Sequence, residues 1–228
     1  MNDVPREPMD AGGRQRALAV EKGLVTGVPA LNRRPWTTRD IVVGSVLAVV
    51  SGFLFWGWGL LWSAVILPLI PFPFHYLLAG IWMLAGVLVP YVIRKPGAAL
   101  LGELVAAFIS MLPGNQWGVS TVLSGLVQGA GAELVFGAGK WRRYATPMLM
   151  AAGAVSGLCA IIFESYWYGY WHMYSTESIL VAAAFMVVSG MVLGGLLSKV
   201  LADSLTRAGV FTGLAIARAR RPLSGERP

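Results

Sequence analysis

Residues 40–58, DIVVGSVLAVVSGFLFWGW, decide the fold, because their only charged side chain is the first. An α-helix rises 1.5 Å per residue, so about 20 apolar residues cross a hydrocarbon core of about 30 Å. Just before this run, Thr37 and Asp40 have the three-residue spacing of a capping box, which marks a helix start. The sequence therefore predicts a transmembrane helix that begins here.

Five further apolar runs of similar length predict five more spans, over residues 74–93, 96–112, 119–138, 146–163 and 178–200. The intervening segment 59–73 is also apolar, but it contains Pro68, Pro71 and Pro73, which interrupt a helix. We expect a partly helical loop there, packed over the bundle, rather than a seventh span. The predicted fold is an all-α integral membrane protein with six transmembrane helices over residues 37–206.

Charge is scarce, and its placement predicts the orientation in the membrane. The 228 residues are 56% hydrophobic and 13% charged, which excludes a soluble enzyme. All 18 Lys and Arg fall in residues 1–39, 94–95, 140–143 and 199–227. By the positive-inside rule these segments are cytoplasmic, so we expect a multi-pass protein of the plasma membrane with both termini in the cytoplasm. The same placement argues against nucleic-acid binding.

The two ends of the chain complete the predicted domain organisation. Residues 1–36 are polar and basic and lack a secretory apolar run, so we expect a disordered cytoplasmic tail. Residues 207–228 form a second basic cytoplasmic tail.

Buried carboxylates are the first candidates for function, because ionisable groups inside a bilayer are costly. Glu103 and Glu133 lie within predicted spans, Glu164 lies at an outer end, and no Lys or Arg lies in the interior of a span to pair with them. Glu103 and Glu133 could share a cation or proton, or they could be neutral and bridge helices. A ridge of Gly125, Gly129 and Gly137 beside Glu133 favours an architectural or proton-sharing role for that residue.

Aromatic residues crowd the loop between the last two spans, in the run YWYGYWHMY over residues 166–174. Such rings could form an interfacial belt or the wall of a site for an organic cation, which ring faces attract. Amides and further rings could line the same cavity. The candidate ligand-binding residues are Asn115, Gln116, Gln128, Glu164, Glu103, Tyr168, Tyr170, Trp171, His172, Trp58, Trp82 and His75.

Two further patterns concern partners and chemistry. Gly44, Ala48 and Gly52 form a small-residue stripe that lets another helix approach, either an internal neighbour or a separate membrane subunit. One Cys and two His leave little to build a metal site. No Walker A, H-E-x-x-H or G-x-S-x-G motif occurs, so we expect no enzyme activity and no cofactor.

Spans three and four carry a resemblance to a known family. The matching residues are RKPGAAL at 94–100, Glu103, the Ala pair at 106–107, Gly114-Asn115, QGAGAE at 128–133 and Phe136. They resemble the YkoE family, the substrate-binding S components of energy-coupling factor (ECF) transporters for thiamin and its hydroxymethylpyrimidine (HMP) precursor. The resemblance implies a six-helix protein that captures the vitamin outside and works with a transmembrane T component and two ABC-type ATPases.

Within that family, the stripe of Gly44, Ala48 and Gly52 would be the surface that meets the T component. Thiamin's cationic thiazolium and its aminopyrimidine call for the acids, rings and amides named above. The alternative is a stand-alone permease coupled to protons or cations, with Glu103 and Glu133 as its relay.

Overall fold

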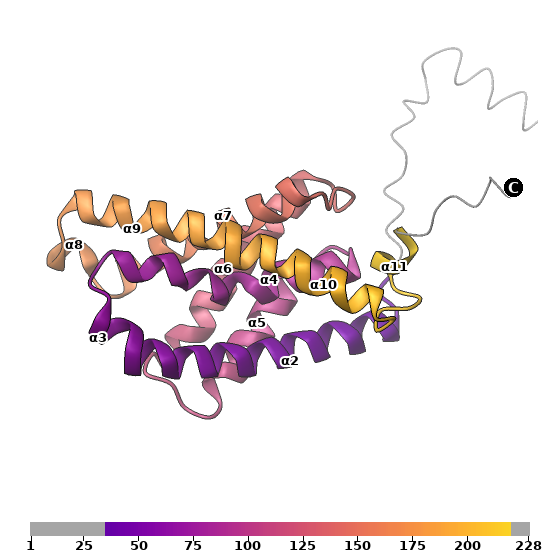
Figure 1. Ribbon diagram of the computed structural model, residues 1–228, viewed down its shortest axis with the longest axis horizontal. Coiled ribbons are helices and arrows are strands. Elements are labelled where there is room, and N and C mark those ends of the chain that lie inside the picture. The colour runs from indigo at the N-terminus through magenta and orange to yellow at the C-terminus, as the bar shows by residue number, and fades with distance from the viewer. Residues whose placement is uncertain (1–34, 220–228) are drawn as a thin grey trace, which may run out of the picture. The chain divides into compact units, whose positions relative to one another are not determined.

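The computed structural model describes residues 35–219, which form helices and no strand (Figure 1). The predicted N-terminal tail therefore lies outside the described residues except for 35–36, whereas residues 207–219 of the predicted C-terminal tail are described and 220–228 are not. The helices in chain order are α2 (Thr38–Leu61), η1 (Trp62–Ile66, a π-helix), α3 (Leu67–Leu69), η2 (Phe74–Met83, a 3-10 helix), α4 (Leu84–Ile93), α5 (Ala98–Met111), α6 (Ser120–Ala138), α7 (Thr146–Trp167), α8 (Tyr170–Met173), α9 (Thr176–Ser189), η3 (Gly190–Leu196, a π-helix), α10 (Leu197–Arg207) and α11 (Ala215–Ala219).

The predicted all-α membrane class is confirmed. Among the described residues, five helical stretches are long and apolar enough to cross a membrane: Thr38–Leu69, Phe74–Ile93, Ser120–Ala138, Thr146–Trp167 and Thr176–Arg207. Helix α5 is apolar but shorter. The count of six spans and the cytoplasmic side of the termini stay predictions. The start of α2 and the region of α11 do lie at the same end of the bundle, where the Arg39 guanidinium donates to the Thr212 carbonyl (Figure 1).

The segment 59–73, predicted as a partly helical loop, is helical over most of its length. The first helix continues through the π-helical turn η1 to Leu69, and the chain turns only over residues 70–73. Pro68 lies near the end of this helix, just after the π turn. A proline ring clashes with the carbonyl four residues earlier in a regular α-helix, and the wider π turn relieves that crowding.

Helix α4 is the centre of the bundle, and all ten of its residues are buried. Its sequence, LAGVLVPYVI, is apolar on every face, which is the pattern of a helix enclosed by others. Helices α2, α5 and α10 pack around it. Because α5 packs against α2, α4 and α6, its side chains reach the middle of the structure.

The small-residue stripe of α2 faces inward, which corrects its proposed role as a partner-docking surface. Ala48 has no exposed surface. A Cβ added to Gly44 would lie 3.6 Å from Val89, and one added to Gly52 would lie 2.6 Å from the Ile109 Cβ. The stripe therefore lets α2 pack closely on α4 and α5 within the chain, and α4 and α5 cover it.

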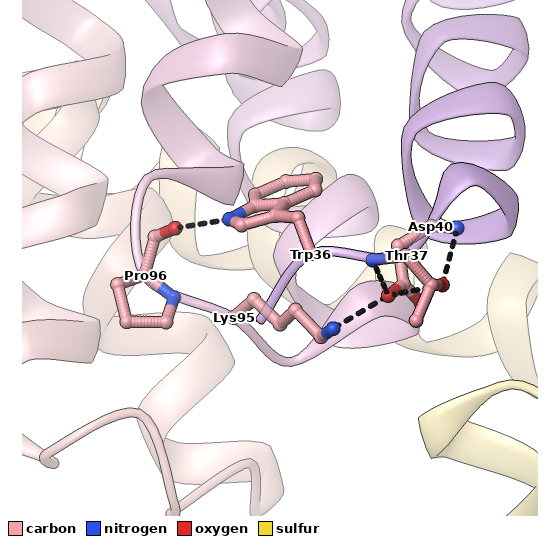
Figure 2. Close-up of polar contacts among 5 residues, drawn as sticks. All are labelled: Trp36, Thr37, Asp40, Lys95 and Pro96. Carbon is pink, nitrogen blue, oxygen red and sulfur yellow. Dashed lines mark hydrogen bonds and ion pairs between the residues drawn. The ribbon is translucent and has the colours of Figure 1, made fainter. Parts of the chain in front are cut away.

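The start of α2 is fastened to the loop between α4 and α5 (Figure 2). The predicted capping box is confirmed, since Thr37 and Asp40 exchange hydrogen bonds. Asp40 Oδ2 also lies 2.6 Å from Lys95 Nζ, and Trp36 Nε1 donates to the Pro96 carbonyl at 3.2 Å. One side chain thus caps the helix and ties it to a loop more than fifty residues away.

Candidate substrate-binding site

A cavity of about 150 Å³ lies between α2, η2, α5 and α6, near the end of the bundle that carries α8. Side chains of the η1, α7 and α8 regions complete its wall. The lining residues are Phe55, Trp56, Gly59, Trp62, Leu67, His75, Tyr76, Ala79, Trp82, Met83, Glu103, Ala107, Ser110, Asn115, Trp117, Ser120, Thr121, Ser124, Gly125, Gln128, Glu164, Tyr168 and Tyr170.

Two acidic side chains line the cavity, and none of its lining residues within 35–219 is Lys or Arg. Glu103 comes from the middle of α5 and is 1% exposed; its Oε2 accepts from the Gly86 N–H at 2.6 Å. Glu164 comes from the last turns of α7, where the Tyr76 hydroxyl donates to its Oε2 at 2.8 Å. The wall therefore attracts ligands that are cationic or rich in hydrogen-bond donors, and it disfavours anions.

Aromatic rings form a large part of the wall. Trp82 meets Trp62 edge to face at a centroid distance of 4.7 Å and meets Trp117 in the same way at 5.4 Å. The Tyr76 and Tyr170 hydroxyls are 3.2 Å apart. Rings held by one another in this way offer flat, fixed surfaces to an aromatic or cationic ligand.

Two buried polar atoms of the lining residues have no hydrogen-bond partner among the described residues. They are Gln128 Oε1 and His75 Nδ1, on side chains that are 6% and 8% exposed. Buried polar groups are nearly always paired, because an unpaired one loses its hydration without compensation. A ligand in the cavity would supply the missing partners.

Asn115 lines the cavity, but its side chain mainly builds the turn between α5 and α6. Its Oδ1 accepts from the N–H groups of Trp117 and Gly118 at 3.0 and 2.8 Å, and its Nδ2 donates to Thr121 Oγ1 at 3.0 Å. The Ser120 hydroxyl lies 2.9 Å from that of Tyr168 and so links this turn to the end of α7.

The phenols outside the spans stay neutral. Burial raises the pKa of Tyr170, and the nearby Glu164 carboxylate raises it further. Burial also raises the pKa of Tyr168. Both hydroxyls therefore remain available as donors at the α8 end of the cavity.

The structure brings most of the predicted ligand-binding residues together and leaves four out. Those that line the cavity are Asn115, Gln128, Glu164, Glu103, Tyr168, Tyr170, Trp82 and His75. Those that do not are Gln116, Trp171, His172 and Trp58. The short helix α8 turns Tyr170 inward, whereas Trp171 is 51% exposed and His172 is exposed as well. Gln116 is exposed in the α5–α6 turn, and Trp58 packs against a neighbouring apolar cluster.

Sequence reasoning missed Tyr76, Trp117 and Ser120. A signal existed for Tyr76, a phenol within an otherwise apolar run and next to His75. A second signal lay on α6, where Ser120, Ser124 and Gln128 recur every four residues and so share one helix face.

Glu133 lies apart from the cavity. Its Oε1 accepts from the Gly97 N–H and from Trp141 Nε1, both at 2.6 Å, and its Oε2 accepts from the Ala99 N–H at 3.0 Å. A carboxylate at these N–H groups caps the start of α5. Glu133 and Glu103 therefore have separate surroundings and do not share a site.

A helical membrane bundle with a ring-walled, carboxylate-lined cavity has the architecture of a membrane-embedded substrate-binding subunit. Comparison with known proteins gives the family. The family described as "ABC-type cobalt transport system, permease component" matches residues 39–159. The Bacillus subtilis (strain 168) protein named "Putative HMP/thiamine permease protein YkoE" is 37% identical over 188 residues, 81% of this chain and 92% of that protein.

A solved structure agrees with these relatives. It is described as "Crystal structure of an S-component of ECF transporter" and matches with a TM-score of 0.77 at 35% identity, over 81% of this chain and 93% of that one. The chain therefore belongs to the YkoE family of ECF-transporter S components. The relatives are transport proteins and not enzymes.

Proposed function

We propose that this chain captures thiamin or its HMP precursor at the outer face of the plasma membrane. The observation that carries the proposal is the cavity, which combines two carboxylates, fixed Trp and Tyr rings and, in the part of the chain that the structure describes, no basic side chain. The name of the Bacillus subtilis relative, an HMP/thiamine permease, supports the same ligand class.

The chemistry of the two ligands matches this wall. Both carry an aminopyrimidine ring, which stacks on aromatic side chains and donates hydrogen bonds from its amino group. Thiamin adds a permanently cationic thiazolium, which a carboxylate and ring faces attract where water is excluded. Glu164, Tyr76 and Tyr170 provide that combination at the α8 end.

Delivery into the cell requires partners. A vitamin scarce outside the cell must be moved against its gradient, and the sequence holds no Walker A motif to supply energy from ATP. We therefore propose that a T component and two ABC-type ATPases complete the transporter, as the S-component family implies. The α8 end then faces outward, because the loop between α7 and α9 carries no Lys or Arg.

Calorimetry on the purified protein tests the proposal directly. We expect saturable binding of thiamin and HMP, and we expect Glu164→Gln to weaken thiamin binding about tenfold or more, because a charge-assisted contact is lost. Glu177→Gln is the matched control, since Glu177 is exposed and does not line the cavity. Absence of binding by the wild-type protein would refute the proposal. Uptake by proteoliposomes that hold this chain alone would point instead to a self-sufficient permease.

A further inference from the structure

The turn between α6 and α7 carries three cations that the fold leaves without a counter-ion. Lys140, Arg142 and Arg143 are all exposed, and none of these side chains has a hydrogen bond or an ion pair among the described residues. The acids Asp40 and Asp203 pair with lysines of other segments. Because three positive charges within four residues repel one another, an anion that binds at this turn is attracted by all three.

The backbone of this turn is held in place by the residues around it. Lys140 and Trp141 have φ angles of 53° and 51°, in the left-handed region that residues other than Gly seldom adopt. The Trp141 N–H donates to the Phe136 carbonyl at 2.8 Å, and its Nε1 donates to Glu133 Oε1 at 2.6 Å. A Cβ added to Gly137 would lie 3.3 Å from the Trp141 ring. The turn is therefore ordered before any anion arrives, which lowers the entropic cost of binding one.

The position of the turn is that of a lipid headgroup. Helices α6 and α7 are both long and apolar enough to cross a membrane, so the residues that connect them lie where the hydrocarbon ends. The turn also lies beside the loop between α4 and α5, because Glu133 accepts from the Gly97 N–H and the Arg94 guanidinium lies 5.0 Å from the centre of the Tyr144 ring. Basic segments at a membrane surface attract anionic phospholipids.

An apolar strip on α6 leads to the turn. Its members recur every four residues and so share one helix face: Leu126, Ala130, Leu134 and Ala138. Leu126 and Leu134 are 42% and 72% exposed, and Ala138, the last residue of α6, is exposed as well. From Leu126 to Ala138 the helix rises about 18 Å, close to the depth of about 15 Å of one leaflet. An acyl chain can therefore lie along the strip while its headgroup reaches the turn.

We propose that the α6–α7 turn binds one anionic phospholipid, with its phosphate at Lys140, Arg142 and Arg143 and an acyl chain along the apolar strip of α6. The planar guanidinium groups suit a phosphate, to which each can donate two hydrogen bonds. A lipid with a net negative charge is preferred over phosphatidylcholine, because the choline cation offsets the phosphate and is repelled by the three bases. The bound lipid offsets the mutual repulsion of these side chains, at a place separate from the cavity.

Native mass spectrometry of the full chain in a neutral detergent tests the proposal, with phosphatidylglycerol and phosphatidylcholine of identical acyl chains as probes. The wild-type protein should bind one phosphatidylglycerol about tenfold or more tightly than phosphatidylcholine. The double variant Arg142→Gln and Arg143→Gln should lose most of this preference. The double variant Arg207→Gln and Arg218→Gln is the matched control, because it removes the same charge from two exposed residues outside the turn, and it should keep the preference. Glycerol 3-phosphate, which has the phosphate but no acyl chain, should not displace the lipid.

Several results would overturn the lipid site. Equal binding of the two lipids by the wild-type protein would do so without any variant having to fold, and would leave the three bases to an acidic partner protein. An unchanged preference in the Arg142 and Arg143 variant, or an equal loss in the control variant, would show that the lipid binds elsewhere or responds only to net charge. Displacement by glycerol 3-phosphate would indicate a site for a soluble phosphate instead. None of these results affects the proposed capture of thiamin or HMP, which calorimetry tests separately.

Discussion

Replacing Asp40 by Asn should show that the ion pair, and not the helix cap alone, fastens α2 to the α4–α5 loop. Asp40 Oδ2 accepts from the Thr37 N–H at 2.9 Å and from the Thr37 hydroxyl at 2.7 Å, and it lies 2.6 Å from Lys95 Nζ (Figure 2). The Lys95 and Asp40 side chains are only 10% and 5% exposed. Asn keeps an oxygen for Thr37 but removes the negative charge that Lys95 faces.

The expected magnitudes separate the two roles. Loss of one partner from a buried ion pair destabilises a protein by about 3–5 kcal/mol, because the other charge stays buried. Loss of an N-cap side chain costs about 1 kcal/mol. We therefore expect about 3 kcal/mol for Asp40→Asn and about 1 kcal/mol for Thr37→Ala. Lys95→Met should resemble Asp40→Asn, and the double variant should cost less than the sum of the two.

Denaturant unfolding in detergent micelles, followed by circular dichroism, measures these differences from the transition midpoints. The double-mutant cycle of Asp40→Asn and Lys95→Met gives the coupling energy directly. Two results would refute the reasoning. One is an Asp40→Asn variant that is no less stable than Thr37→Ala. The other is a double variant whose loss of stability equals the sum of the losses of Asp40→Asn and Lys95→Met.

Three further predictions concern packing and the cavity. Gly153→Ala would place a Cβ 2.0 Å from the Gly190 carbonyl oxygen, so thermal unfolding should show that the protein loses about 3 kcal/mol or more of stability. Gly57→Ala is the control: a Cβ there has nothing within 4 Å, so the variant should be as stable as the wild-type protein or slightly more stable. Trp82→Ala should weaken thiamin binding by about 1–2 kcal/mol in calorimetry, and Trp171→Ala should leave it unchanged. A larger loss of binding in Trp171→Ala than in Trp82→Ala would show that the exposed Trp171 ring contacts the ligand. Phosphate esters of either ligand should compete at least about tenfold less well, because no Lys or Arg of residues 35–219 lines the cavity; equal competition would contradict the charge argument.

The sequence predicted the helices well wherever a single physical rule applied. Apolar run lengths located the candidate spans, and the Thr37–Asp40 spacing located the start of α2 within one residue. The extent of the first helix was missed because proline rules describe a regular α-helix, and η1 departs from that geometry before Pro68. Local propensity carries no information about such a widened turn.

The candidate site was predictable in kind but not in detail. Residue chemistry identified Glu103, Gln128 and Glu164, since polar groups inside a membrane span need a reason to be there. The aromatic run at 166–174 indicated the right region, and two of the four candidates chosen from it, Tyr168 and Tyr170, line the cavity. Density of rings does not reveal which ones face inward, because the four-residue helix α8 rotates Tyr170 and Trp171 to different sides.

The small-residue stripe of α2 shows what a sequence pattern cannot predict, namely which helix makes the contact. Spacing of Gly and Ala by four residues indicates that a helix approaches closely, and the structure has such an approach. The pattern does not identify the approaching helix. Here α4 and α5 occupy the stripe, and they use the same kind of contact that a separate subunit would use.

The acidic side chains of the bundle fall into groups that differ in how fully hydrogen-bond donors of the protein engage them. Three carboxylates serve the fold, each engaged by donors of other segments: Asp40, Glu133 and Asp203. Glu177 is exposed at the start of α9. The remaining acids of residues 35–219, Glu103 and Glu164, both line the cavity, and each accepts one hydrogen bond from the rest of the fold, from the Gly86 N–H and the Tyr76 hydroxyl respectively. Buried acids that the fold does not saturate are costly to keep in a membrane, so the presence of both on the wall of one cavity is best explained by a ligand that carries hydrogen-bond donors or a positive charge.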